Sequence, residues 1–162
     1  MQKSFLIQLN MNKILFSFIL FIPVLIKAQE PVKNNNTIIV KGVTFSQVKE
    51  RLLDSGVFID KQNAEDGTLI TERKGYCECP NKDFFQLIYY IRIKDSVATI
   101  RAKYSSAVQL RLINNKQNTD AKDDFSEVLY WKDKKSSYHY LFGIMSDFAK
   151  SLNGISIEYK TL

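Results

Sequence analysis

Residues 84–104 show the clearest alternation of apolar and polar positions in the chain. Two runs rich in β-branched and aromatic residues flank Asp95-Ser96, which is typical of two strands joined by a two-residue turn. With that turn, one side of the hairpin is apolar throughout, and it consists of Leu87, Tyr89, Ile91, Ile93, Ala98, Ile100, Ala102 and Tyr104. A slip of one residue would mix the two sides, so the pattern predicts this register.

The segment before the hairpin predicts a strand followed by a helix. Residues 37–41 are β-branched and apolar, as expected of a first strand. Thr44 and Gln47, three positions apart, form a capping box, the signature of a helix N-terminus. Gly56 is placed to end this helix, because glycine adopts the left-handed conformation that follows many helix C-caps.

Further strands are expected on both sides of the hairpin. Residues 57–62 and 68–74 predict a second and a third strand around an Asp-Gly turn, and residues 75–83 predict a loop. The hairpin supplies strands four and five. Alternation at residues 108–112 predicts a sixth.

The last part of the chain predicts a loop, a helix and a strand. Residues 114–124 are polar and predict a solvated loop, whereas residues 125–131 are apolar but too short to assign to helix or strand. Ser137 is the predicted N-cap of an amphipathic helix that ends at Asn153-Gly154. Residues 155–159 predict a terminal strand.

This order of elements predicts an α+β fold. We expect an antiparallel sheet of about six strands with two helices packed on one face. The apolar faces can supply an ordinary core for a single domain at residues 37–162, with no metal or disulfide needed.

The start of the chain resembles a secretory signal peptide. Lys13 precedes an apolar run at residues 14–26, and Ala28 is the predicted last residue removed. Residues 1–28 are therefore assigned to the signal, with Met11 as a possible true start. An uncleaved anchor is the alternative, although the run is short for a membrane span. The prediction is an exported protein, periplasmic or secreted, with no stable span after cleavage.

Charge changes this picture little. The chain has 23 Lys and Arg against 17 Asp and Glu, and three of the lysines lie in residues 1–28, so the remainder carries a net charge of +3. A surplus this small does not imply nucleic-acid binding. Residues 29–36 contain Pro31 and three consecutive asparagines, and this polar composition predicts a flexible lead-in.

The two cysteines, Cys77 and Cys79, are separated by one residue. A disulfide between them is possible in an oxidising compartment, but it would close a small, strained ring. Plain thiols or pairing between molecules are the alternatives. Two cysteines do not make a zinc site, and the only histidine, His139, is distant in sequence. We therefore predict no metal and no cofactor.

No catalytic residues are predicted. A Cys-His or serine nucleophile would have to use His139, and neither a Gly-x-Ser-x-Gly turn nor a phosphate-binding loop is present. Acidic residues cluster only in predicted loops, where solvated charge is the ordinary interpretation. A spatially assembled carboxylate pair in a small hydrolase is the alternative.

The polar side of the hairpin is the best candidate site. We define the basic-aromatic face as Tyr90, Arg92, Arg101 and Lys103, with Tyr90 opposite Arg101 in a position to form a cation–π contact. An ordinary solvated sheet face is the competing interpretation. The functional interpretation is a surface that docks an unknown protein or envelope component, and the positive charge of the face favours an acidic one.

A family resemblance accompanies this pattern. An exported chain with a strand, then Gly42-Val43-Thr44-Phe45-Ser46-Gln47-Val48 leading into a helix, a strand pair with Gly67-Thr68-Leu69-Ile70-Thr71, a meander, a late helix and a last strand resembles small exported bacterial domains of unknown function. Those domains have a TATA-binding-protein-like, helix-grip fold of order β-α-β4-α-β. The resemblance implies a binding or structural role in the envelope, with no catalytic residues and no DNA binding.

Three functions follow as hypotheses. The first is a non-enzymatic exported binding or structural module of the cell envelope. The second is an inhibitor or immunity protein against a secreted toxin or hydrolase. The third is a small hydrolase.

Overall fold

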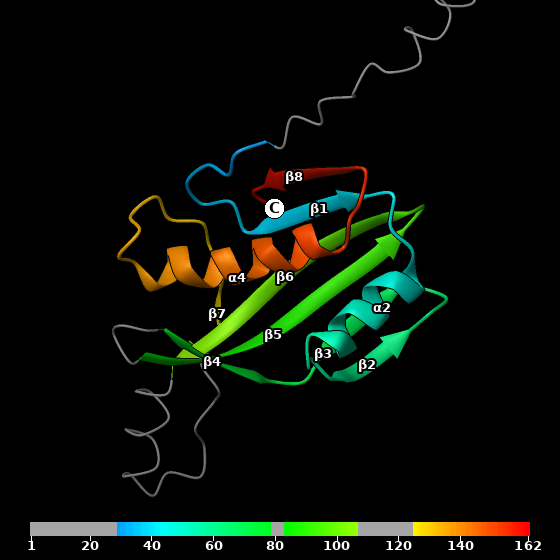
Figure 1. Cartoon of the computed structure of the whole chain (residues 1–162), viewed down its shortest axis with the longest axis horizontal. Coiled ribbons are helices and arrows are strands. Elements are labelled where there is room, and N and C mark those ends of the chain that lie inside the picture. Colours follow the sequence, from blue (N-terminus) through cyan, green and yellow to red (C-terminus); the bar gives the residue numbers. More distant parts are fainter. Residues whose placement is uncertain (1–28, 79–82, 107–124) are drawn as a thin grey trace, which may run out of the picture.

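A long hairpin forms the centre of the sheet (Figure 1). The protein is represented by a computed structural model that describes residues 29–78, 83–106 and 125–162. Strand β5 (Asp83–Lys94) pairs with β6 (Val97–Ser106) in the predicted register, with Ile91 opposite Ile100. Asp95 and Ser96 form the turn with φ of 51° and 59°, as a type I′ turn requires.

The hairpin separates its two sides as the sequence predicts. Seven of the eight apolar-side residues are at most 8% exposed, and the eighth, Tyr104, is half-buried. Arg92 on the opposite side is exposed. The predicted register is therefore confirmed.

Short strands flank both sides of the hairpin. These are β1 (Thr37–Lys41), β2 (Ile59–Asn63), β3 (Thr68–Thr71), β4 (Lys74–Glu78), β7 (Ser126–Glu127) and β8 (Ser156–Lys160). Strands β3 and β4 pair with successive parts of β5, while β1 and β7 pair with successive parts of β6. Strand β2 continues the sheet beyond β3, and β8 beyond β1. Every pairing is antiparallel.

The described sheet thus has eight strands, not about six. The expected loop at residues 75–83 was partly wrong, because Lys74–Glu78 is strand β4. The break after β3 falls at Glu72 and Arg73, inside the strand expected at residues 68–74. The ambiguous apolar segment at residues 125–131 contains the two-residue strand β7.

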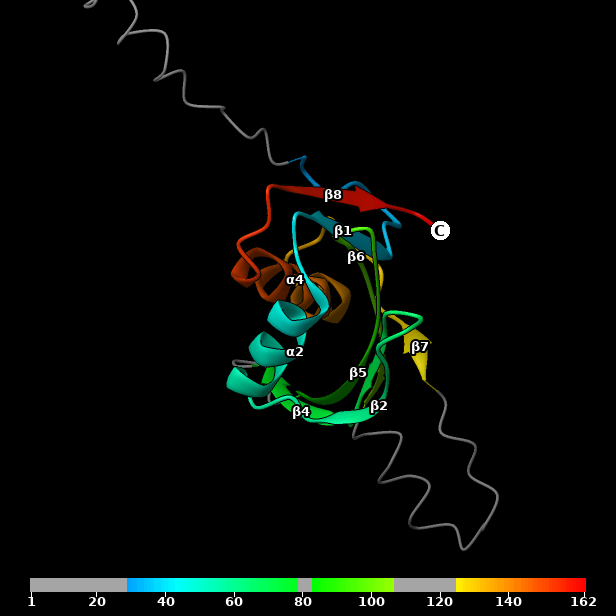
Figure 2. The same cartoon turned by 90° about the vertical axis from the view of Figure 1, so that its right-hand side faces the viewer.

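Both helices lie on the concave side of the curved sheet (Figure 2). Helix α2 (Phe45–Asp54) begins at the predicted capping box of Thr44 and Gln47, and Gly56 follows its C-cap with φ of 66°. Helix α4 (Ser137–Ser151) has Ser136 as its N-cap, so the predicted cap at Ser137 was off by one residue. The Ser136 hydroxyl accepts a hydrogen bond from Tyr138 N, as an N-cap side chain does. Ser137 is already the first residue of the helix, so it does not hold the N-cap position.

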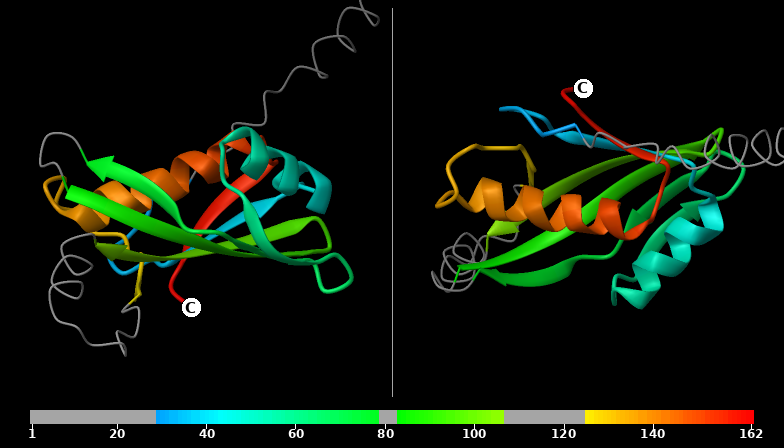
Figure 3. Two further views of the ribbon diagram at one scale, coloured as in Figure 1. Left: turned by 90° about the horizontal axis from the view of Figure 1, so that it is seen from below. Right: turned by 45° about the horizontal axis from the view of Figure 1, so that its top comes forward.

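Helices α2 and α4 run across the same face of the sheet (Figure 3), and the buried core cluster joins their side chains to those of the sheet. It joins Val48 and Leu52 of α2, Leu141 and Met145 of α4, and the apolar side of the hairpin. The helices therefore cover one face of the sheet, and no described helix packs on the other. The described part of the chain is an α+β domain with a large antiparallel sheet and two helices.

Some predictions fall outside the described residues. These are the signal peptide with Met11 (residues 1–28), Cys79, the strand expected at residues 108–112 and the loop at residues 114–124.

Candidate binding face

The basic-aromatic face alternates along β5 and β6 with the core residues, so it lies on the side of the sheet away from the core. Figure 2 shows the helices on the other, concave side of these strands. Tyr90 and Arg92 come from β5, and Arg101 and Lys103 from β6, at positions that alternate with buried core residues. Arg92 is exposed and the other three are half-buried. The structure brings the four predicted residues together on neighbouring strands, while their binding role stays a prediction.

Arg92 is the most accessible cation of the face. It is paired in the sheet with Thr68 of β3 on one side and Thr99 of β6 on the other. No carboxylate among the described residues forms an ion pair with it. Its side chain is exposed on the solvent side of β5.

Arg101 has a different environment. Its guanidinium forms an ion pair with Glu127 of β7, and the two side chains are 41% and 40% exposed. The expected contact between Arg101 and Tyr90 is replaced by one from Lys103, whose Nζ lies 5.6 Å from the centre of the Tyr90 ring. Glu127 thus neutralises part of the positive charge of the face.

A shallow depression of about 260 Å³ lies within the face. It is lined by Tyr90, Arg101, Ala102, Lys103 and Glu127. The lining combines an aromatic ring, two cations and one carboxylate. Such a site suits a polar, negatively charged group better than an apolar ligand.

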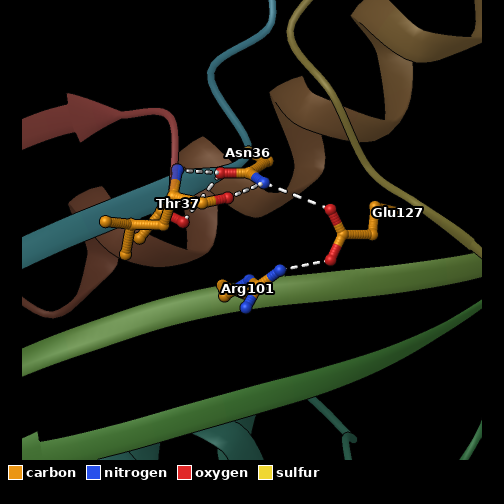
Figure 4. Close-up of polar contacts among 5 residues, drawn as sticks. Asn36, Thr37, Arg101 and Glu127 are labelled. Atoms are coloured by element: carbon orange, nitrogen blue, oxygen red, sulfur yellow. Dashed lines mark hydrogen bonds and ion pairs between the residues drawn. The ribbon is translucent and has the colours of Figure 1, made fainter.

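A hydrogen-bonded network beside the face involves the asparagine run (Figure 4). The Asn36 amide donates from Nδ2 to Glu127 Oε2 at 3.1 Å and to the Leu162 carbonyl at 3.0 Å. Its Oδ1 accepts from Leu162 N at 3.0 Å and from Thr37 Oγ1 at 2.9 Å. Asn35 and Asn36 are only 3% and 5% exposed.

The sequence interpretation missed this network. The asparagines suggested a flexible lead-in, but the structure places two of them in the folded domain. One sequence feature could have indicated that these asparagines are ordered. They directly precede the β-branched strand that starts at residue 37, where asparagine side chains can bond to neighbouring backbone.

The cysteines do not form a described site. Cys77 lies on β4 with an exposed side chain, and Cys79 is outside the described residues, so a disulfide between them stays a prediction. Within residues 29–78, 83–106 and 125–162, no three His, Cys, Asp or Glu side chains gather as metal ligands. His139 lies with Nδ1 2.8 Å from the Trp131 carbonyl oxygen.

A second concavity lies on the helix side. It has a volume of about 280 Å³, and its lining includes Val57, Lys74, Tyr76, Tyr89 and Phe148. Burial raises the pKa of both tyrosine hydroxyls, most strongly that of Tyr89. A tyrosine hydroxyl is already neutral at physiological pH, and burial keeps these two neutral to more alkaline pH.

No helix in the described part of the chain is both long and apolar enough to cross a membrane. In comparisons with known proteins, no family model and no curated protein matches the sequence. The resemblance to small exported domains with a TATA-binding-protein-like fold accordingly stays a prediction.

Proposed function

We propose that this protein is a non-enzymatic, exported binding module of the cell envelope. Its basic-aromatic face, Tyr90, Arg92, Arg101 and Lys103, docks an acidic protein or envelope component. The observation that carries the proposal is the separation of the sheet into two unlike faces. One face is occupied by the helices and core, and the other presents an exposed arginine without a carboxylate partner among the described residues.

Charge and geometry favour an acidic partner. Three cations, Arg92, Arg101 and Lys103, lie close together on β5 and β6. Glu127 is the one carboxylate among the residues that line the depression in this face. Complementary charge of this kind increases the association rate and fixes orientation more than it adds affinity. The Tyr90 ring provides a flat apolar surface against which a partner side chain can pack.

Charge reversal tests the proposal. The protein would be immobilised and used to capture partners from an envelope extract, and Arg92→Glu should reduce capture by about tenfold or more, since a like charge then faces the acidic partner. Lys134→Glu is the matched control, because Lys134 is exposed in the connector before α4, away from the basic-aromatic face. Equal capture by both variants and the unmodified protein would refute the assignment of the face.

A further inference from the structure

The carboxylate of Glu127 is held by two donors, Arg101 and Asn36, which we call the clamp (Figure 4). One carboxylate oxygen pairs with the Arg101 guanidinium of β6. The other accepts a hydrogen bond of 3.1 Å from Asn36 Nδ2, which precedes β1. One donor from β6 and one from the residue before β1 therefore hold the two oxygens of one carboxylate.

The clamp is preorganised on the Asn36 side. The three other hydrogen bonds of the Asn36 amide, to Thr37 and to the backbone of Leu162, do not involve Glu127. They fix the plane of the amide, so the Nδ2 proton would point to the same place without Glu127. A receptor group that needs no reordering loses less free energy on binding.

Glu127 itself is not essential to the position of its strand. The next residue, Val128, is fully buried and donates from its backbone N to the Ala102 carbonyl at 3.0 Å. Tyr130 N donates to the Asn35 carbonyl at 2.7 Å. These contacts keep the segment on the sheet. The Glu127 side chain is 40% exposed and can rotate into solvent while the backbone stays in place.

We infer that Arg101 and Asn36 form a binding site for a carboxylate of an acidic peptide segment, and that Glu127 is its internal competitor. This inference rests on the proposed function and names the group that the face recognises. A peptide is favoured because Glu127 is itself a peptide glutamate, presented from a strand antiparallel to β6. The adjacent depression, with Lys103 and Tyr90, can accept the neighbouring residues of such a segment.

The inference predicts that weakening the competitor tightens binding. A half-exposed ion pair is weak, so Glu127 can leave the clamp and an external carboxylate can take its place. The fraction of molecules in which Glu127 occupies the clamp lowers the apparent affinity for that external carboxylate. Glu127→Gln should therefore bind an acidic peptide about three- to tenfold more tightly than the unmodified protein. Arg101→Gln combined with Glu127→Gln should lose that gain.

The probe is a fluorescein-labelled oligoglutamate peptide, with oligoglutamine as the neutral comparison, measured by fluorescence anisotropy on the purified protein. Glu158→Gln is the matched control. It removes the same charge from the same side of the sheet, where Glu158 pairs with Lys41 and not with the clamp. Circular dichroism verifies that each variant is folded.

Tighter binding by Glu127→Gln but not by Glu158→Gln, lost again with Arg101→Gln, supports the clamp. Equal tightening by the two glutamate variants would mean that net charge alone acts, and would overturn the inference. Oligoglutamate binding by neither the unmodified protein nor Glu127→Gln would also overturn it. In both of these cases, a loss of partner capture by Arg92→Glu would leave the proposed function standing.

Discussion

Replacing Asn36 with alanine should destabilise the protein far more than the same change at its neighbour Asn35. The two asparagines are almost equally buried, at 5% and 3% exposure. They differ in their partners. Asn36 accepts from the hydroxyl of Thr37, which is fully buried, whereas the Asn35 side chain bonds to Val32 N and Thr161 Oγ1 on exposed residues.

The magnitude follows from which groups water can reach after the change. In Asn36→Ala, the Thr37 hydroxyl loses its partner inside the protein, at a cost of about 1–3 kcal/mol. The groups of Glu127 and Leu162 are accessible and can bond to water, so each lost bond there costs only about 0.5 kcal/mol. The total is about 3 kcal/mol for Asn36→Ala, against about 1 kcal/mol for Asn35→Ala.

Urea unfolding followed by far-ultraviolet circular dichroism measures both variants. A loss of about 3 kcal/mol is a large share of the 5–15 kcal/mol of a typical domain, so the midpoint should move clearly. Adding Thr37→Val to Asn36→Ala should recover part of the loss, because it removes the stranded donor. Equal costs at positions 35 and 36, or no recovery by Thr37→Val, would refute the reasoning.

Other predictions concern a buried tyrosine, two glycines and the central turn. Burial raises the pKa of Tyr89 well above its ordinary value, so above about pH 10 only the unfolded chain ionises there and the free energy of unfolding falls as the pH rises. In Tyr89→Phe, the free energy of unfolding measured with urea should fall less steeply with pH above about pH 10, by up to about 1.4 kcal/mol per pH unit. The same steepness in the variant and the unmodified protein would contradict this. Gly67→Ala should cost at least about 2 kcal/mol, because φ is 66° and the new Cβ would lie 1.8 Å from the Ile93 carbonyl oxygen. Gly143→Ala should add about 0.5–1 kcal/mol of stability in helix α4, because no described atom outside the neighbouring residues and the adjacent helix backbone lies within 4 Å of the new Cβ. Thermal unfolding of the two glycine variants must give shifts of opposite sign. Ser96→Gly should stabilise by about 0.5–1 kcal/mol, since Ser96 has φ of 59°, and a lower melting temperature would count against the type I′ turn.

The parts of the fold with strong local patterns were predictable. Alternation over both strands of the hairpin specified a single register, because a slip would bury Arg92 and expose Ile91. The start of α2 was equally clear, since the side chain and backbone of Thr44 and Gln47 are enough to form a capping box.

The missed elements lack such a local pattern. Strand β4 carries Gly75 and has Lys74 on the core side of the sheet, where its Nζ bonds to the carbonyl of Ser55 after α2. A lysine at an inward position hides the apolar alternation. Strand β7 has only two residues, too few for any periodicity, and it pairs at Lys103 and Tyr104 of a strand distant in sequence.

The candidate site was predictable only in part. Strand alternation placed the four residues of the basic-aromatic face together. It could not show that Glu127 neutralises Arg101 or that Asn36 holds Glu127, because these contacts join segments far apart in the chain. Side-chain partners across such separations depend on the tertiary fold, which sequence periodicity does not specify.

The position of β1 between β6 and β8 has a consequence for how the chain acquires its structure. Thr37, at the start of β1, pairs with Lys160, close to the other end of the described chain. Ribosomes deliver β1 long before its second neighbour, β8, exists, so one flank of β1 stays unpaired until β8 has been made. Contacts of such high sequence separation slow folding. A nascent chain therefore carries an unpaired sheet edge until β8 is present, and such an edge is a surface to which chaperones can bind.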